Sequence, residues 1–321
     1  MTLLVALANS RQAVLVADRR ITSAGKVVDD EFNKLCVFCC DDARGAFAFT
    51  GIATAGNFST SEWLWQTLNA AGADHEELIA VLAFLTERAD RDINTLPVAD
   101  RRLSVLFCGY LYHAELPEPA CYLMSNFEFE AAGTGKFQVS RLDHGTGQFV
   151  HAAGTSTGFE RRHRERLEAL LSKPLSAPAL VRASVLKLQE SAGNPDGFGV
   201  IGSQCSSAAL LAERDTTITT TYHSNFESLV AYGPHVVINR GLIVCSSEIF
   251  SCTALAGPEI RKTDPCWCES GMTFGECHLQ KFGSYYVRFG TLRTPMYAVA
   301  GMEFDPPRRS GRIFWVASGY Q

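Results

Sequence analysis

Short apolar runs separated by turn residues open the chain and predict a series of buried strands. Residues 3–8 and 13–17 are apolar throughout, and the polar residues 9–12, Asn-Ser-Arg-Gln, lie between them. A third, mostly apolar run covers residues 34–40. Apolar runs of this length, bounded by turn residues, are typical of strands that are covered on both faces. The N-terminal forty residues therefore predict a strand–turn–strand unit followed by a third strand.

Longer segments carry apolar residues at intervals of three and four, which predicts helices. These helices are expected at residues 59–71, 74–96, 159–172 and 179–191. Asp74 opens an acidic first turn and is a candidate N-cap for the second helix. Further strands are expected at residues 102–112, 120–129, 198–201, 216–222 and 236–244. This order predicts an α+β fold, a four-layer αββα sandwich in which two antiparallel sheets lie between helix layers.

Composition limits the classes of partner. The chain has 321 residues, 46% of them hydrophobic, which is enough for a full core. Its net charge of −5, from 34 acidic and 29 basic residues, gives no electrostatic reason to expect nucleic acid or an anionic membrane as a partner. We also expect no transmembrane helix, because no window approaches eighteen uninterrupted apolar residues.

The cysteines and the first residues bear on the compartment. Eight of the eleven cysteines are scattered through apolar, strand-like stretches, where reduced cysteine is a common core residue. The first residues lack the basic segment that begins a signal peptide. We therefore expect a protein of the reducing cytoplasm, without a disulfide framework.

Thr2 is the first residue that indicates chemistry. Removal of Met1 would leave a residue that carries both a hydroxyl nucleophile and a free α-amino group. Such an amine titrates at about 7.7–8.0, close to the pH at which a general base works. Asp18, Arg20 and Lys34 follow 16, 18 and 32 residues after Thr2.

This set resembles the catalytic residues of the proteasome β-subunit family, including the bacterial proteasome-like proteases, which are N-terminal-nucleophile hydrolases. The resemblance implies a Thr2 nucleophile, a Lys34 cation oriented by Asp18, and an Arg20 that braces Asp18 and the turn. Residues 50–53, Thr-Gly-Ile-Ala, look like the family's glycine turn, which implies that the Gly51 amide helps to form an oxyanion hole.

Two further segments differ in how well they match the family pattern. The Gly154-Thr155-Ser156 turn precedes a predicted helix and resembles the family's Gly-Ser-Gly turn, which makes Thr155 a candidate third hydroxyl in the site; an ordinary loop turn is an equal alternative. The Asp and Ser that support the terminal amine in the family have no clean counterpart in residues 191–197. Ser191 and Asp196 are candidate substitutes, although their order is reversed.

A second chemical signal lies near the C-terminus. Cys266, Cys268, Cys277 and His278 have C-x-C-x8-C-H spacing, a Cys3His donor set suited to structural zinc. The stretch is similar to the SEC-C zinc motif, and a disulfide or idle core cysteines are the alternatives. We expect a hydrolase domain at 1–256 and an extension at 257–321 with the motif at 264–279. The extension would recognise a partner protein or dock against the hydrolase body.

Together these features predict a threonine-nucleophile amidohydrolase with a peptide or amide substrate. The alternatives are a small-amide hydrolase and a catalytically inactive proteasome-like scaffold that uses its zinc module for protein interaction. The resemblance also leaves open a homo-oligomer, since proteasome subunits assemble into rings.

Overall fold

The computed structural model of the chain describes residues 2–23, 25–72, 74–129, 135–143, 147–155, 158–194, 196, 199–214, 216, 218–223, 228–230, 235–239, 242–246, 263, 271–273 and 276. Its helices are α1 (Thr60–Ala71), α2 (Leu78–Asp92), α3 (Arg161–Leu171) and α4 (Ala177–Gly193). Its strands are β1 (Leu3–Ala8), β2 (Gln12–Asp18), β3 (Ile21–Ser23), β4 (Lys26–Asp29), β5 (Leu35–Cys39), β6 (Ala43–Gly51), β7 (Thr54–Ala55), β8 (Phe58–Ser59), β9 (Leu103–Leu111), β10 (Glu118–Ser125), β11 (Gln138–Arg141), β12 (Phe149–Gly154), β13 (Cys205–Leu211), β14 (Thr219–His223), β15 (Ser228–Val230), β16 (His235–Asn239) and β17 (Leu242–Ser246).

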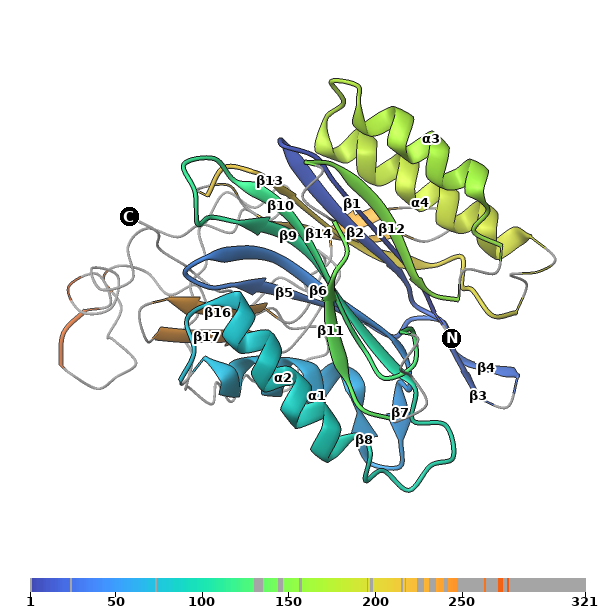
Figure 1. The fold of residues 1–321 in the computed structure, drawn as a ribbon, viewed down its shortest axis with the longest axis horizontal. Coiled ribbons are helices and arrows are strands. Elements are labelled where there is room, and N and C mark those ends of the chain that lie inside the picture. Colours follow the sequence, from blue (N-terminus) through green and yellow to red (C-terminus); the bar gives the residue numbers. More distant parts are fainter. Residues whose placement is uncertain are drawn as a thin grey trace.

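Most of these strands form two sheets that lie between helices (Figure 1). One sheet has the order β12-β1-β2-β13-β14-β15 and the other has the order β11-β10-β9-β6-β5-β16-β17. Their strand pairs are antiparallel except for β16 and β5, which run parallel. The predicted combination of helices with two antiparallel sheets is thus confirmed. No helix in the described part of the chain has the length and apolar character needed to cross a membrane.

The N-terminal strand is buried on both faces, which explains its unbroken apolar sequence. Leu3 and Val5 point toward a core shared with α3 and α4, whereas Leu4 and Ala6 point toward the core between the two sheets. Successive strand residues alternate between faces, so a strand covered on both sides needs apolar residues at every position. Burial of β1 fixes the position of Thr2, the residue before it.

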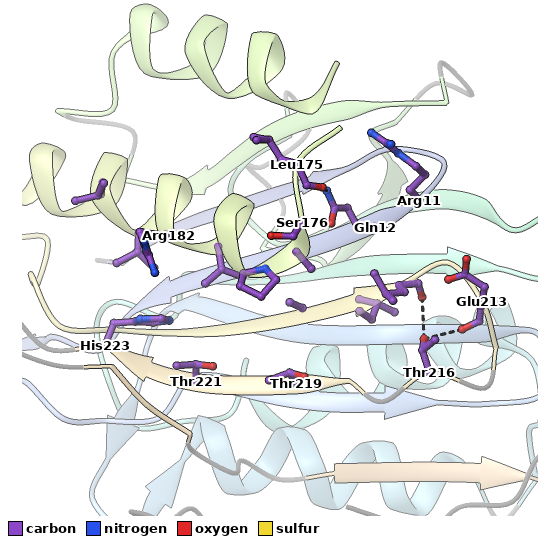
Figure 2. Close-up of a pocket in the computed structure, with 18 of the residues that line it drawn as sticks. Arg11, Gln12, Leu175, Ser176, Arg182, Glu213, Thr216, Thr219, Thr221 and His223 are labelled. Carbon is purple, nitrogen blue, oxygen red and sulfur yellow. Dashed lines mark hydrogen bonds between the residues drawn. The ribbon is translucent and has the colours of Figure 1, made fainter. Parts of the chain in front are cut away.

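Helix α4 packs on β2 and β13 and thereby covers the middle of the six-stranded sheet. Strand β14 lies beyond the helix, and a pocket opens between α4 and the strands β13 and β14 (Figure 2). The lining of this pocket does not include the residues around Thr2.

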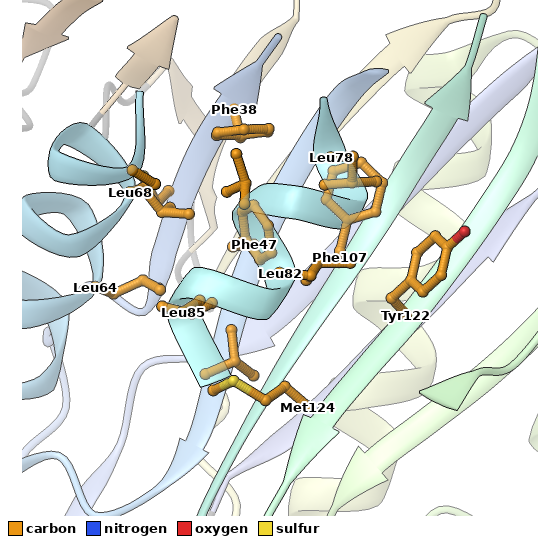
Figure 3. Packing of buried hydrophobic residues seen from close by; sticks show 14 of the residues in the cluster. Phe38, Phe47, Leu64, Leu68, Leu78, Leu82, Leu85, Phe107, Tyr122 and Met124 are labelled. Carbon is orange, nitrogen blue, oxygen red and sulfur yellow. The ribbon is translucent and has the colours of Figure 1, made fainter. Parts of the chain in front are cut away.

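The seven-stranded sheet packs its outer face against α1 and α2 (Figure 3). Aromatic rings fill this core: Phe38 meets Phe47 edge-on at 5.2 Å between ring centroids, and Phe47 lies 5.1 Å from Phe107. Such tilted and edge-on arrangements are the favoured geometry of aromatic pairs. This core holds β6, and with it Thr50 and Gly51, in a fixed place relative to β1.

The helix predicted to start at Asp74 begins instead at Leu78, so Asp74 is not its N-cap. The carboxylate of Asp42, from the turn between β5 and β6, accepts the Leu78 N–H at 2.7 Å. A carboxylate at a helix N-terminus satisfies a free donor and interacts favourably with the helix dipole. This acceptor is distant in sequence, so local capping rules could not identify it.

Two strand predictions were wrong in detail. Residues 199–201, within the strand predicted at 198–201, form a turn, and the strand of that region is β13, Cys205–Leu211. Its sequence, Cys-Ser-Ser-Ala-Ala-Leu-Leu, is rich in small residues with weak β-propensity. The single strand predicted at 236–244 is two paired strands, β16 and β17.

Candidate active site

Thr2 lies at the edge of the inter-sheet core, where three hydrogen bonds from two residues hold its main chain. Its N–H donates to Thr50 Oγ1 at 3.0 Å, and the same hydroxyl donates to the Thr2 carbonyl at 3.0 Å. The Thr155 N–H donates to that carbonyl as well, also at 3.0 Å. Thr2 is only 3% exposed. The nitrogen that would become the terminal amine therefore faces an oxygen acceptor from β6.

Lys34, the residue before β5, brings its ammonium group to the Thr2 side chain. Its Nζ donates to Thr2 Oγ1, to the Arg20 carbonyl at 2.6 Å, and to Asp18 Oδ1 at 3.3 Å. A lysine ammonium has three N–H donors, and each of them meets one acceptor here. Because Lys34 is almost completely buried, these contacts hold its nitrogen in one place beside the hydroxyl.

Asp18, the last residue of β2, is fully buried and completes the charged pair. Its Oδ2 accepts the Leu3 N–H at 2.6 Å, and its Oδ1 accepts the Arg20 N–H at 2.9 Å. These bonds orient the carboxylate toward Lys34 and also hold the chain immediately after Thr2. One carboxylate therefore positions both the nucleophile segment and the cation.

Burial and pairing act against each other in this ion pair. Burial raises the pKa of Asp18 and lowers the pKa of Lys34, and the attraction between the two charges opposes both shifts. A lysine whose pKa is lowered holds its proton less tightly than a surface lysine does. The Asp18 carboxylate opposes this loss and favours the ammonium form of Lys34 beside the Thr2 hydroxyl.

Arg20 contributes to the site through its main chain. Its N–H and carbonyl contact Asp18 and Lys34, respectively. Its guanidinium instead forms two hydrogen bonds to Asp30, at 2.6 and 3.1 Å, and a longer one to the Ile201 carbonyl at 3.4 Å. The expected bracing of Asp18 by Arg20 is therefore a backbone contact, and the side chain ties this turn to neighbouring segments.

Gly51 and Thr155 lie in the main chain next to groups that contact Thr2. Gly51 ends β6 directly after Thr50, with φ of +104°, and a Cβ at that position would lie 2.1 Å from the Arg102 carbonyl oxygen. The position therefore requires glycine. Thr155 follows β12 and binds the Thr2 carbonyl with its amide. The role of the Gly51 N–H as an oxyanion donor remains a prediction. The role of Thr155 as a third hydroxyl in the site also remains a prediction.

Two residues that contact Thr2 or the adjacent Gly154 were not recognised from the sequence as site residues. Thr50 contacts both the nitrogen and the carbonyl of Thr2, and its position next to Gly51 was the available signal. Glu128 is half-buried and accepts the Gly154 N–H at 3.1 Å; burial raises the pKa of its carboxyl. Glu128 thereby holds the end of β12 against the segment that carries Thr2.

Ser191 and Asp196 do not have the contacts expected of substitutes for the family's amine-supporting pair. The Ser191 hydroxyl donates to the Lys187 carbonyl inside α4 at 2.8 Å. Asp196 is exposed, and its main-chain N–H donates to Asn194 Oδ1 at 3.1 Å. Among the described residues, the group bonded to the Thr2 nitrogen is the Thr50 hydroxyl.

A substitution at Gly154 tests how closely the chain must approach Thr2. Gly154 has φ of +84°, and a Cβ there would lie 2.2 Å from the Thr2 carbonyl oxygen. We expect Gly154→Ala to lower the free energy of unfolding by more than the roughly 1–3 kcal/mol that backbone strain alone costs. Gly25→Ala is the matched control, because Gly25 has φ of +76° with no atom within 4 Å of its added Cβ. Equal losses for the two variants in urea denaturation would contradict the close packing at Thr2.

The predicted zinc ligands Cys266, Cys268, Cys277 and His278 lie outside the described residues. Within the described part of the chain, no group of three or more His, Cys, Asp or Glu side chains is arranged to hold a metal ion. The cysteines whose side chains are described there, from β5, β9, β10, β13 and residue 40, are buried, as expected of core cysteines.

Comparisons with known proteins support the C-terminal motif and add a distant structural likeness. A family model for the SEC-C motif, a zinc-binding type of motif, matches residues 263–280. No curated protein matches the chain. Among solved structures, the chain is similar to the Anbu (Gly-1) mutant from Hyphomicrobium sp. strain MC1, at 12% identity and a TM-score of 0.47, covering 70% of this chain and 88% of that one. At this level of similarity, no activity is transferred from that protein.

Proposed function

We propose that the protein is a proteasome-like N-terminal-nucleophile hydrolase that cleaves amide bonds, with peptides as the substrate class. The observation that carries this proposal is the contact of Lys34 Nζ with both Thr2 Oγ1 and Asp18, beside a Thr2 nitrogen that is hydrogen-bonded to Thr50. A threonine hydroxyl that lies between a buried cation and the α-amino group of the same residue is an activated nucleophile. The two sheets between helix layers are the arrangement expected of this class.

The reaction would proceed through an ester on Thr2. After removal of Met1, the α-amino group, directly or through a water, would take the proton of Thr2 Oγ1 while Lys34 stabilises the developing alkoxide. The oxygen would attack the amide carbonyl, and the Gly51 N–H would stabilise the resulting oxyanion by on the order of 3–4 kcal/mol. The amine would leave with a proton, and water would then hydrolyse the ester. Thr50 takes the position of the missing Asp–Ser support by fixing the amine.

Thr50 offers a test of amine positioning. We expect Thr50→Val, which keeps the shape and removes the hydroxyl, to lower kcat by about tenfold to a hundredfold, because the nucleophile's amine loses its acceptor at 3.0 Å. Thr50→Ser keeps the hydroxyl and should retain most of the activity. Steady-state kinetics on a fluorogenic peptide measure the effect. Wild-type kcat in the valine variant would show that Thr50 has no part in positioning the amine.

The runner-up function is a proteasome-like scaffold without catalysis. It is favoured by the surface position of Asp196 and the intrahelical hydrogen bond of Ser191, which leave the family's amine-supporting pair unmatched. The two functions separate in one experiment. A hydrolase reacts covalently with a threonine-directed epoxyketone, and a scaffold does not. Assays with peptides and with small amides would then separate the peptidase from the small-amide hydrolase.

We further propose that Cys266, Cys268, Cys277 and His278 hold one structural zinc ion. The donor set fits, because three thiolates and one imidazole complete a tetrahedral site without an open position. Zinc in such a site supplies folding free energy. In the cytoplasm, where we expect the protein to act, the extension would contact a protein partner, and the hydrolase domain would associate with further copies of itself.

Metal analysis tests the zinc proposal. We expect elemental mass spectrometry of the acid-digested protein to find one zinc ion per chain. The Cys268→Ser variant should lose most of this zinc, because one thiolate ligand is gone. Cys36→Ala is the control, since Cys36 is a buried core residue of β5. A zinc content unaffected by Cys268→Ser would exclude this ligand set.

A further inference from the structure

The pocket beside α4 is a second candidate site, separate from Thr2. It has a volume of about 1040 Å³ and lies between α4 and the strands β13 and β14 (Figure 2). Cavities that hold small organic ligands have volumes of roughly 300–1,000 Å³ and combine apolar walls with a few polar groups. This pocket has both features, and the proposed hydrolysis at Thr2 does not use it.

Apolar side chains line both α4 and β13 at the pocket. Val181, Val185 and Leu186 of α4 line one side, and Ala209 and Leu211 of β13 line the other. Leu186 is 50% exposed and Leu211 is 40% exposed, so two large aliphatic side chains face open space at the pocket. An aliphatic ligand that covers them gains roughly 25 cal/mol for each Å² of apolar surface removed from water. These walls therefore favour a hydrocarbon chain.

The two ends of the pocket differ in charge. Arg182 and His223 lie at one end, and Arg11 and Glu213 lie at the other (Figure 2). The second end carries one positive and one negative residue, so its charges offset each other. At the first end, the His223 Nε2 and the Ser207 hydroxyl are 2.9 Å apart, and burial lowers the pKa of His223 to about 4, which leaves this imidazole neutral at pH 7. The charge at that end comes from the exposed guanidinium of Arg182.

The pocket also has a polar strip along its length. Thr219, Thr221 and His223 alternate along β14 and line the pocket from the same face. Thr219 and His223 are four residues apart, and four residues of a strand span about 13 Å. The polar strip therefore runs beside the apolar wall for about this length. A narrow, extended ligand matches this shape better than a compact one.

We propose that this pocket binds an amphipathic organic anion, an extended aliphatic chain that ends in a carboxylate. The hydrocarbon lies between α4 and β13 along Leu186 and Leu211, and the carboxylate pairs with the Arg182 guanidinium at the His223 end. The planar guanidinium binds a carboxylate through two parallel hydrogen bonds. The apolar walls and the Arg182 cation thus contact different parts of one molecule.

Calorimetric titration of the full-length protein with decanoate, below the concentration at which it forms micelles, tests this proposal. We expect one site per chain. Arg182→Glu should weaken binding at least tenfold by reversing the charge at the head group. Arg164→Glu, an exposed arginine of α3 outside the pocket, should leave the affinity within twofold of wild type. Thr221→Trp, which places a large ring in the pocket from a half-buried strand position, should block binding.

A neutral ligand of equal chain length distinguishes a site that selects for negative charge from a nonspecific hydrophobic surface. We expect decan-1-ol to bind at least tenfold more weakly than decanoate to the wild-type protein, and equally to wild type and Arg182→Glu. The proposal is overturned by three results: no saturable binding of decanoate, equal weakening by Arg164→Glu and Arg182→Glu, or decanoate binding that survives Thr221→Trp. Circular dichroism spectra that match wild type establish that each variant is folded.

Discussion

We expect Thr2→Ala to abolish amide hydrolysis and covalent labelling by an epoxyketone, while the protein stays folded. The variant lacks the oxygen that would attack the substrate, and no other described hydroxyl contacts Lys34 Nζ. Its alanine still leaves Lys34 with two acceptors, Asp18 and the Arg20 carbonyl, so the buried ammonium keeps its countercharge. We therefore expect a loss of about 1–2 kcal/mol in the free energy of unfolding, the usual cost of one hydrogen bond.

Thr2→Ser is the control for this prediction. It keeps the hydroxyl and the amino group, and should retain labelling and a measurable turnover. Labelling of purified protein, followed by peptide mapping, locates the adduct. Full activity in Thr2→Ala would contradict the proposed nucleophile.

We expect Lys34→Met to remove the proposed activity and also to destabilise the fold. The methionine fills a similar volume but leaves the Asp18 carboxylate, which is fully buried, without its cation. Removal of one partner from a buried ion pair costs about 3–5 kcal/mol, far more than the loss of an exposed pair. We expect this loss in urea denaturation at pH 7, together with a loss of epoxyketone labelling.

The destabilisation of Lys34→Met depends on pH in a defined direction. Burial raises the pKa of Asp18 above its ordinary value of 3.8, and the charge of Lys34 opposes that rise. Without Lys34 this pKa rises further, so the folded variant binds the proton more tightly than the unfolded chain does. The penalty is therefore absent below pH 3.8 and grows as the pH rises through the folded-state pKa. The difference in stability between wild type and variant should widen from pH 4 to pH 7.

A second substitution separates stability from catalysis. Asp18→Asn combined with Lys34→Met removes both charges, so we expect most of the lost stability to return. Activity should not return, because the cation beside Thr2 Oγ1 is still absent. A double variant as unstable as Lys34→Met would show that the charge pair is not the cause of the destabilisation.

The grouping of Asp18 and Lys34 with Thr2 was predicted from their spacing, which resembles that of the proteasome β-subunit family, and the strands explain how the grouping arises. Apolar runs fix β1, β2 and β5, and the residues at their ends, Asp18 and Lys34, are carried to Thr2 by strand pairing and sheet stacking. Thr50 and Glu128 were missed because they reach Thr2 and Gly154 from other strands and loops. No local pattern of residues encodes such contacts.

The fold could be predicted less well where local preference and final structure disagree. Strand β13 contains small residues of weak β-propensity and is held by pairing with β2 and β14 on either side. Helix α2 starts where the distant Asp42 carboxylate accepts its first N–H, and not at the local acidic turn. In both cases tertiary contacts decided the outcome.

The central claim is that Thr2 is an N-terminal nucleophile in the mature protein. Intact-mass spectrometry of the native protein after incubation with an epoxyketone tests this claim in one measurement. We expect a mass that lacks one methionine and carries one inhibitor, since an epoxyketone requires both the hydroxyl and the free amine of an N-terminal threonine. A mature protein that keeps Met1, or that loses it and stays unlabelled, would contradict the hydrolase and leave the scaffold as the function.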